Sequence, residues 1–448
     1  MNAQLLNPFA RDTPEIIEGT LDNAYASCLA FNAGLGLFAG NYLAVGRTDG
    51  WVSIYDLETR TILRWFNAHL KSVSSVSWSP LSRYLASASS DWNVNIWDLG
   101  NGPARCVRTL RWDGPAILAF FSPITSRSLL VVLESRELYV VTFPEFDETK
   151  EPSSTPIRIR LEANEPINTA CFTPDGAWII AGTSKGSLSV FNANTGIQAT
   201  KLNQVASSAI RQLSFDLHGR NLVANLNDRS VRTFSVVNTE SGIPPEFVAR
   251  HKFQDLIGRT PWSGVAFSSD SEYVMGGAAQ STAHNVYIWD RDAGVLVKIL
   301  EGPKEPLISA HWHPSRPQIA SIASSGDVYL WSTLATEIWS AYAPGFEELE
   351  RNVEYEERED EFDLDHLEDT DRQQQDEAQN VNVFENGPVP ETSLPKPLEP
   401  IQVRLTHSTL APILSATEPA TRNMFVDDDN QVGFFIPPLL EEYVDEKE

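Results

Sequence analysis

The sequence predicts an all-β protein in which a seven-bladed propeller precedes a largely disordered, acidic C-terminal tail. The first observation behind this prediction is a repeat of about 45 residues that runs through roughly the first three quarters of the 448-residue chain. The second is an uneven charge. Residues 345–448 contain 28 acidic and 7 basic residues, a net of −21 out of −26 for the whole chain, which leaves −5 for residues 1–344. High charge with little apolar content prevents a segment from folding on its own.

Two alternating markers define the repeat. The first is an aromatic residue followed by a small or polar residue, and its seven copies begin at Phe31, Trp78, Phe121, Phe172, Phe215, Phe267 and Trp312. The second is a short strand of alternating polarity, and its copies lie at 52–56, 94–98, 138–143, 188–192, 231–235, 286–290 and 328–332. Three of these strands end in Trp-Asp or Tyr-Asp. Strands with this period and these endings are typical of four-stranded WD-repeat blades, and seven blades fit within residues 20–343.

The connections between the strands carry turn signals, among them Thr48-Asp49-Gly50 and Ser325-Gly326-Asp327. Two connections are long. We expect residues 144–156 to lengthen the link between blades three and four, and residues 238–260 the link between blades five and six. How the ring closes is left open by the sequence: residues 337–342 can supply the final strand, and residues 5–9 can add to the same blade.

The domain prediction is therefore a propeller over residues 1–343, an activation and acidic partner-binding segment over 344–371, and a mostly disordered tail with short docking motifs over 372–448. The tail contains a proline-rich stretch at 388–400 and a late apolar run at 432–440. For the late run, two interpretations stay open: it is either a free docking motif or a segment that packs back on the propeller.

Composition restricts the cellular setting. The three cysteines, Cys28, Cys106 and Cys171, show no CxxC pairing, so we expect buried free thiols in a reducing compartment. Residues 1–10 lack a signal-peptide pattern, and no apolar window approaches the roughly 18 residues of a membrane span. We expect a soluble intracellular protein. Phosphate would repel the acidic tail, which favours basic protein surfaces as its partners.

One group of residues has the composition of a hydrolase triad. The second repeat contains His69, Ser87 or Ser89, and Asp91, close to Trp97. Nucleophilic catalysis needs an exposed serine and an oxyanion hole, and the sequence signals neither. In WD-repeat propellers a His, a Ser, an Asp and a Trp at these places form a structural hydrogen-bond network. We therefore interpret the four residues His69, Ser87, Asp91 and Trp97 as structural.

Other signals for chemistry are weak. His311 and His313 flank Trp312 without a third ligand, and there is no phosphate loop or dinucleotide fingerprint. We expect no catalytic residue, no metal and no cofactor. Basic residues recur in the predicted loops, either as ordinary solvated surface or as a discontinuous basic rim for DNA phosphates or an acidic protein. They are Arg47, Lys71, Lys185, Arg229, Arg259 and Lys304.

The junction after the propeller has an unusual composition. Between residues 339 and 363, the aromatic residues Tyr342, Phe346, Tyr355 and Phe362 stand among many carboxylates. A solubilising tail does not need aromatic residues. Aromatic side chains fill pockets on a partner, and acidic side chains pair with its basic patches. The segment therefore reads as a docking peptide.

The residues resemble a known family of WD-repeat proteins. The matching stretches include 43–46 and 87–91 in the first blades, 255–262 and 312–314 in the last ones, and the junction 352–359, Asn-Val-Glu-Tyr-Glu-Glu-Arg-Glu. They resemble the family of retinoblastoma-binding protein five, which in fungi is the Swd-type WD-repeat subunit of COMPASS, the Set/MLL histone methyltransferase complex. The resemblance covers roughly residues 1–385, and its most specific parts are the Arg-Thr-Pro-Trp region at 259–262 and the junction.

This resemblance implies a non-catalytic scaffold and activating subunit, located in the nucleus, of a complex that methylates lysine four of histone three. It implies contact with the catalytic SET domain through Trp339, Tyr342, Pro344, Phe346 and Leu349. It implies binding of the SPRY domain of an Ash-two-type subunit through Tyr355, Glu356, Glu357, Arg358, Glu359, Glu361, Phe362 and Asp363. A second WD-repeat propeller would bind Val381 and Val383, between which Asn382 replaces the acid of the family pattern. It also implies contact with the nucleosome, its histones and DNA backbone, through basic loops, where Arg229 and Arg259 match the family by local motif. Two further loop cations, Lys185 and Lys304, are added to this possible contact surface because of their charge.

Two other functions fit a propeller with an acidic tail. A WD-repeat adaptor of a ubiquitin ligase would bind ligase adaptors rather than SET proteins. A histone chaperone would bind free histones through residues 354–371.

Overall fold

The computed structural model describes residues 13–32, 39–100, 103–143, 155–159, 161, 165–202, 205–237, 243–255, 260–280, 283–333 and 436. All of them belong to one of the two units into which the chain separates, residues 1–334 together with 414–448. The predicted boundaries at 343 and 371 lie outside the described residues and stay predictions. Within the described part, no helix is long and apolar enough to cross a membrane.

The described residues form 28 strands in seven antiparallel four-stranded sheets. Blades 1 to 3 contain β2 (Ala26–Phe31), β3 (Tyr42–Arg47), β4 (Trp51–Asp56), β5 (Ile62–Asn67); β6 (Val73–Trp78), β7 (Tyr84–Ser89), β8 (Asn93–Asp98), β9 (Arg105–Arg111); β10 (Ala116–Phe121), β11 (Ser128–Leu133), β12 (Leu138–Thr142), β13 (Thr155–Ile159). Blades 4 and 5 contain β14 (Ile167–Phe172), β15 (Trp178–Thr183), β16 (Leu188–Asn192), β17 (Gln198–Leu202); β18 (Ile210–Phe215), β19 (Asn221–Leu226), β20 (Val231–Val237), β21 (Glu246–Phe253). Blades 6 and 7 contain β22 (Trp262–Phe267), β23 (Tyr273–Ala279), β24 (His284–Asp290), β25 (Leu296–Glu301); β26 (Leu307–Trp312), β27 (Ile319–Ala323), β28 (Val328–Ser332), β1 (Ile16–Leu21).

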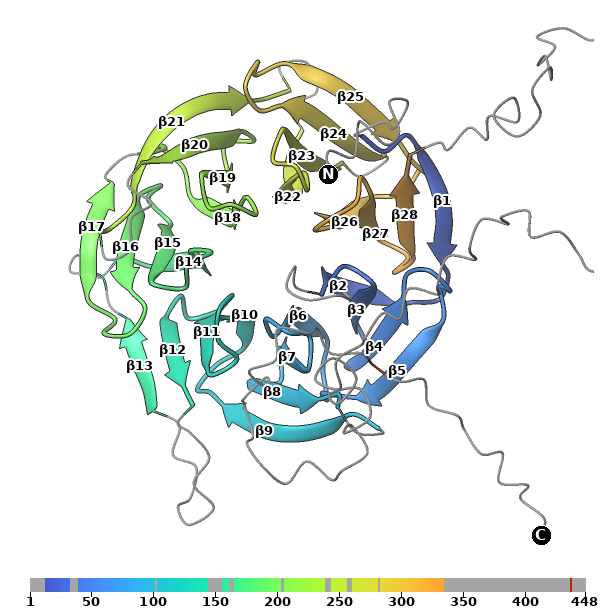
Figure 1. Ribbon diagram of the computed structural model, residues 1–448, viewed down its shortest axis with the longest axis horizontal. Helices are drawn as coiled ribbons and strands as arrows, with labels where there is room; N and C mark the ends of the chain where they lie inside the picture. The colour runs from blue at the N-terminus through green and yellow to red at the C-terminus, as the bar shows by residue number, and fades with distance from the viewer. Residues whose placement is uncertain are drawn as a thin grey trace, which may run out of the picture. The chain divides into compact units, whose positions relative to one another are not determined.

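The sheets stand around a ring, with the first strand of each blade at the centre and the fourth at the rim (Figure 1). Burial follows this order. All six residues of the second strands β7 and β15 are buried, whereas most of the outer strand β9 is exposed or half-buried. The seven strands marked in the sequence are the third strands of the seven blades. The prediction of an all-β, seven-bladed WD-type propeller is confirmed.

An N-terminal strand closes the ring. Strand β1 pairs antiparallel with β28, with Leu21 opposite Val328 and Ile17 opposite Trp331. Residues 337–342, predicted as the final strand, and residues 5–9, predicted as a possible addition to the same blade, both lie outside the described residues. The outer position belongs to Ile16–Leu21, because the β1–β28–β27–β26 order already completes four strands.

Both long connections were assigned to the wrong place. Residues 144–154 connect β12 to β13 and so belong to blade 3. Pro156 already lies in the outer strand β13, where it pairs with Val141 of β12. The stretch 238–260 contains the outer strand β21 of blade 5, whose Phe247 is paired with Val236. Half-exposed outer strands carry little apolar alternation, so they resemble loops in the sequence.

The hydrophobic core is divided among the seven blade interfaces. Each of seven clusters of buried residues draws its side chains from two neighbouring blades. The cluster between blades 1 and 2 includes Tyr42, Ala44, Trp78 and Trp97, and also Ile436 from far along the chain. The blades are therefore held together by side-chain packing rather than by shared strand hydrogen bonds.

Candidate functional site

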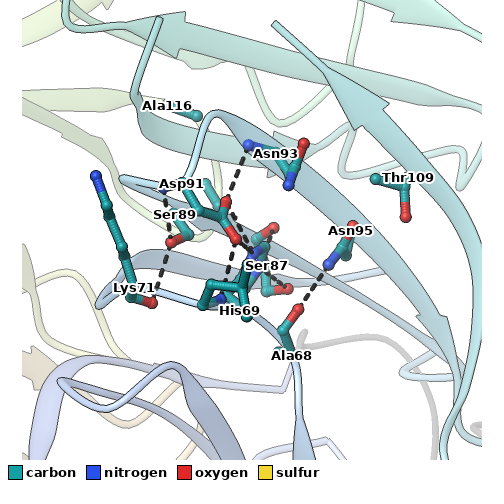
Figure 2. Close-up of polar contacts among 12 residues, drawn as sticks. Ala68, His69, Lys71, Ser87, Ser89, Asp91, Asn93, Asn95, Thr109 and Ala116 are labelled. Atoms are coloured by element: carbon teal, nitrogen blue, oxygen red, sulfur yellow. Dashed lines mark hydrogen bonds and ion pairs between the residues drawn. The ribbon is translucent and has the colours of Figure 1, made fainter.

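The predicted polar residues of blade 2 form one hydrogen-bonded chain. His69 Nδ1 lies 3.1 Å from Asp91 Oδ2, and its Nε2 lies 2.8 Å from Ser87 Oγ. The indole Nε1 of Trp97 donates to the same Ser87 oxygen at 3.0 Å. Figure 2 shows His69 between Asp91 and Ser87, with the ammonium of Lys71 pointing away from them. The chain connects the loop before β6 to strands β7 and β8.

The electrostatics of this network favour a neutral imidazole. Burial lowers the pKa of His69, and the nearby Asp91 carboxylate opposes this shift only in part. Burial also disfavours the Asp91 carboxylate, but His69 and the backbone N–H groups of Asn93 and Leu70 outweigh it and hold the pKa of Asp91 below its usual value. Neutral His69 then donates to Asp91 through Nδ1 and accepts from Ser87 through Nε2. Ser87 is completely buried, so no substrate reaches its hydroxyl.

Blade 7 contains a second, related network that the sequence analysis missed. His284 Nε2 lies 2.7 Å from Ser321 Oγ, and Trp331 Nε1 donates to the same oxygen at 2.8 Å. Burial lowers the pKa of His284 to about 4. The signal was available, because Ser321 precedes Trp331 by ten residues, as Ser87 precedes Trp97. The histidine escaped notice because it comes from β24 of the neighbouring blade.

His311 in β26 and His313, which directly follows that strand, have structural surroundings. His313 is buried, and its Nε2 lies 2.9 Å from the carbonyl oxygen of Gly40 in blade 1. Its Nδ1 accepts from the backbone N–H groups of Ser315 and Arg316. Burial lowers the pKa of His311 and of His313 to about 4. Among the described residues, no group of three or more His, Cys, Asp or Glu side chains is arranged to hold a metal ion.

Three of the four predicted nucleosome-contact residues lie at one end of the blades. Lys185 lies in the β15–β16 turn, Arg229 in the β19–β20 turn and Lys304 in the β25–β26 connection, and all three are exposed. In an up-and-down blade, the turn between the second and third strands and the link to the next blade share one end. The same end carries the His69–Asp91 network. Arg259 lies outside the described residues.

The turn of Arg229 has a demanding backbone. At this turn position Gly50 and Gly186 have φ of 91° and 80°, and a Cβ on either would lie within 2.3 Å of a carbonyl oxygen in the next connection. Arg229 occupies the same position with φ of 64°, as does Arg136 in blade 3. A non-glycine residue pays a conformational cost in this region. The Arg229 side chain is thus presented to solvent by a backbone that glycine would adopt more easily.

Comparisons with known proteins agree with this architecture. The family "WD domain, G-beta repeat" matches residues 60–98 and 155–192. Each match runs from the outer strand of one blade to the third strand of the next, so the sequence repeat is offset from the blade. This offset explains why an N-terminal strand completes the last blade. The chain is 36% identical over 379 residues to the Schizosaccharomyces pombe "Set1 complex component swd1", which covers 81% of this chain and 90% of that protein. The chain belongs to the family of Swd1 and retinoblastoma-binding protein 5.

Two further members of the Swd1 family extend the comparison. The Drosophila melanogaster "Retinoblastoma-binding protein 5 homolog" is 36% identical over 406 residues, covering 87% of this chain and 78% of that protein. The crystal structure of the Myceliophteria thermophila Cps50 (Swd1) β-propeller domain matches with a TM-score of 0.64 and 32% identity. That match covers 70% of this chain and 99% of the other. The resemblance stated from the sequence is confirmed.

The predicted docking residues of this Swd1-family chain lie outside the described residues. This holds for the SET-domain group at 339–349, the Ash-two-type group at 355–363, and Val381 and Val383. Their assignments stay predictions. The three cysteines are free, but the expectation that all are buried is wrong for Cys106, which is exposed in the outer strand β9. Burial raises the pKa of Cys28 and of Cys171 to about 12.

Proposed function

We propose that this chain is a non-catalytic scaffold and activating subunit of a Set1-type, COMPASS-class complex that methylates lysine four of histone three. The observation that carries the proposal is the 36% identity with the fission yeast Set1 complex component over 90% of that protein. The buried, hydrogen-bonded state of Ser87 and His69 supports a structural rather than a catalytic role for the propeller. A subunit that acts on histones in chromatin would work in the nucleus, and we include a nuclear location in the proposal.

The division of labour in this proposal follows the predicted domains. The propeller, residues 1–343, is a rigid platform from which residues 344–371 emerge. Trp339, Tyr342, Pro344, Phe346 and Leu349 contact the SET domain. The Ash-two-type subunit binds residues 355–363, whose carboxylates meet basic groups while Tyr355 and Phe362 fill pockets. Val381 and Val383 bind a second WD-repeat propeller.

The mechanism we propose for activation is a population shift. A peptide that binds the ordered form of a mobile SET domain better than its open form raises the active fraction. Because the same peptide binds the Ash-two-type subunit, tethering raises the effective concentration of each partner for the other. No group of this chain takes part in the chemistry.

The exposed cations at one end of the propeller support a role in nucleosome engagement. The side chain of Lys185 is 70% exposed, and its Nζ lies 3.5 Å from Glu165 Oε1. The same Glu165 oxygen lies closer to Lys201 Nζ, at 3.2 Å. Arg229 and Lys304 are also exposed. Cations on neighbouring turns of a rigid ring can contact DNA phosphates. Together with Arg259 they form the proposed contact surface.

Methyltransferase activity tests the proposal. A SET-domain protein and an Ash-two-type subunit are assayed on histone three alone, with the full chain, with a peptide of residues 339–371, and with a scrambled peptide of the same composition. Stimulation by the chain and by the native peptide places activation in the junction. Stimulation by the chain alone assigns it to the propeller as well. If neither stimulates, the proposed function is wrong, and binding to free histones or ligase adaptors distinguishes the chaperone from the ubiquitin-ligase adaptor.

A further inference from the structure

Ile436 lies inside the propeller core although 102 residues, 334–435, separate it from the last described residue of blade 7. Its exposed fraction is 0%, and it belongs to the hydrophobic cluster between blades 1 and 2. Its backbone N–H donates to Tyr42 Oη at 3.2 Å. Figure 1 draws it as the short red segment near β4. A residue so far along the chain thus completes the packing of two early blades.

The side chains that cluster with Ile436 at one end of the blade interface define its binding position, which we call the notch. Tyr42 begins β3, Trp97 is the next-to-last residue of β8, and Leu99 follows that strand. These are the ends of the strands that face the turns between first and second strands and between third and fourth strands. The notch therefore lies at the end of the blades opposite Lys185 and Arg229.

The notch combines apolar side chains with the hydroxyl group of Tyr42. The rings of Tyr42 and Trp78 stack with centroids 6.3 Å apart, and Trp78 donates its indole N–H to the carbonyl oxygen of Ala30. Burial raises the pKa of Tyr42, and the hydrogen bond from Ile436 N–H acts in the opposite direction. A buried tyrosine hydroxyl needs a hydrogen-bond partner, and the backbone of Ile436 supplies one. The apolar cluster and the hydrogen bond to Tyr42 thus both suit an extended aliphatic residue.

The local sequence fits such an occupant. Ile436 follows Phe434 and Phe435 and precedes Pro437 and Pro438. A proline restricts the residue before it to the extended region, which reduces the entropy that this residue loses on docking. The apolar run at 432–440 has no acidic residue, unlike the stretches on either side of it.

We propose that residues 432–440 are the intramolecular ligand of this notch, a C-terminal anchor that seats Ile436 between blades 1 and 2. Residues 334–435 then form a loop attached to the propeller at both ends, and the acidic docking segment lies within that loop. A flexible chain of this length has an end-to-end distance of about 50–60 Å, and the entropy cost of closing it grows only with the logarithm of its length. The anchor thus confines the docking segment near the propeller at modest cost. This inference does not depend on which partners that segment binds.

Hydrogen exchange of the full chain, followed by mass spectrometry, tests the anchor. In the wild type, we expect peptides covering 432–440 to exchange at least ~10-fold slower than an unfolded chain. Ile436→Asp should abolish this protection and speed exchange at the start of β3 and after β8, with the blades far from the notch unchanged. Ile413→Asp, the same substitution elsewhere in the tail, is the matched control and should behave as wild type.

Tyr42→Phe separates the hydrogen bond from the packing. It removes the acceptor for Ile436 N–H while keeping the ring, so protection of 432–440 should fall to a value between wild type and Ile436→Asp.

Three results would overturn the proposal. The first is exchange of 432–440 at the unfolded rate in the wild type. The second is a loss of protection spread evenly over all seven blades in Ile436→Asp, which would make Ile436 part of the global folding unit rather than a docked ligand. The third is protection of 432–440 that rises with protein concentration, because the occupant would then come from a second copy.

Discussion

A serine, a histidine and an aspartate in one hydrogen-bonded chain can be catalytic or structural, and the burial of the serine distinguishes the two roles. In blade 2 the Ser87 hydroxyl accepts from Trp97 and donates to His69, so its hydrogen-bonding capacity is used inside the core. Blade 7 repeats the arrangement with Ser321 and Trp331 but takes its histidine from the neighbouring blade. The arrangement that the two blades share is the serine–tryptophan pair, ten residues apart on adjacent strands.

Removing the shared hydroxyl should destabilise the fold. Ser87→Ala leaves His69 Nε2 and Trp97 Nε1 without their buried partner, which costs about 1–3 kcal/mol of unfolding free energy. Urea unfolding followed by tryptophan fluorescence measures the change. Ser135→Ala, in an exposed turn of blade 3, is the control and should lie within about 0.5 kcal/mol of wild type. Equal losses in both variants would contradict the structural role of the network.

Buried histidines should make the fold sensitive to acid. His284 and His313 have a pKa of about 4 in the folded chain, against about 6.5 when unfolded. The unfolded chain binds the extra protons, so the stabilisation is complete above pH 6.5 and is lost as pH falls toward 4. We expect a loss of roughly 2–3 kcal/mol for each of these buried histidines. Unfolding free energies measured between pH 4 and 7 test this.

His313→Asn should flatten that dependence, because asparagine keeps a hydrogen-bond acceptor but does not titrate. His218→Asn, at an exposed position, serves as the control. A slope that is the same in both variants would show that His313 is not a source of the acid sensitivity.

At the scale of elements, the sequence pattern predicts the buried third strands of the blades but not the exposed outer strands. Third strands such as β8 alternate cleanly and end in Trp-Asp, so they were located within one or two residues. Outer strands such as β9 and β17 are exposed or half-buried and alternate only weakly in polarity. For the same reason the outer strands β13 and β21 were not recognised within the predicted insertions 144–156 and 238–260. Ring closure was beyond local patterns, because the pairing of Leu21 with Val328 joins residues more than 300 apart.

The closing strand should be required for a stable ring. Deleting residues 1–21 removes β1, exposes the edge of β28 and uncovers part of the blade 7 core. An unpaired edge promotes aggregation, so the melting temperature should fall and light scattering should rise on heating. Deleting residues 1–12 only, which keeps β1 intact, should leave both unchanged. Identical melting of the two truncations would mean that another segment closes the ring.

The turn of Arg229 allows charge and stability to be separated. Arg229→Gly suits the positive φ, so the unfolding free energy should stay the same or rise by up to about 1 kcal/mol. If Arg229 contacts a DNA phosphate, affinity for nucleosomes should fall, and the slope of log affinity against log salt should drop by about one. Arg136→Gly, at the same turn position of blade 3, is the matched control. A slope unchanged in Arg229→Gly would remove this residue from the proposed contact surface.

At the scale of the whole molecule, a seven-bladed ring is followed in the sequence by an acidic segment for which we propose a docking role. Composition alone identifies that segment, since aromatic residues among carboxylates suit a partner surface and not a core. Composition cannot predict where Ile436 packs, because its binding position is built from residues such as Tyr42, nearly 400 positions away in the sequence. The late apolar run at 432–440 therefore stayed open between two interpretations until the structure placed one of its residues.

The proposed binding of an Ash-two-type subunit can be tested at the two aromatic residues of the acidic segment 355–363. Replacing Tyr355 and Phe362 by alanine should weaken binding of the Ash-two-type subunit by about 2 kcal/mol for each anchor that is buried in the complex, roughly 30-fold each, while the propeller melts as in wild type. Titration calorimetry with the full chain measures this, and Tyr443→Ala in the far tail is the control. Raising salt should weaken binding further in wild type and double variant alike, because screening acts on the carboxylates and not on the aromatic contacts. Wild-type affinity in the double variant would show that the aromatic residues do not anchor the segment, and would leave charge alone to hold the partner.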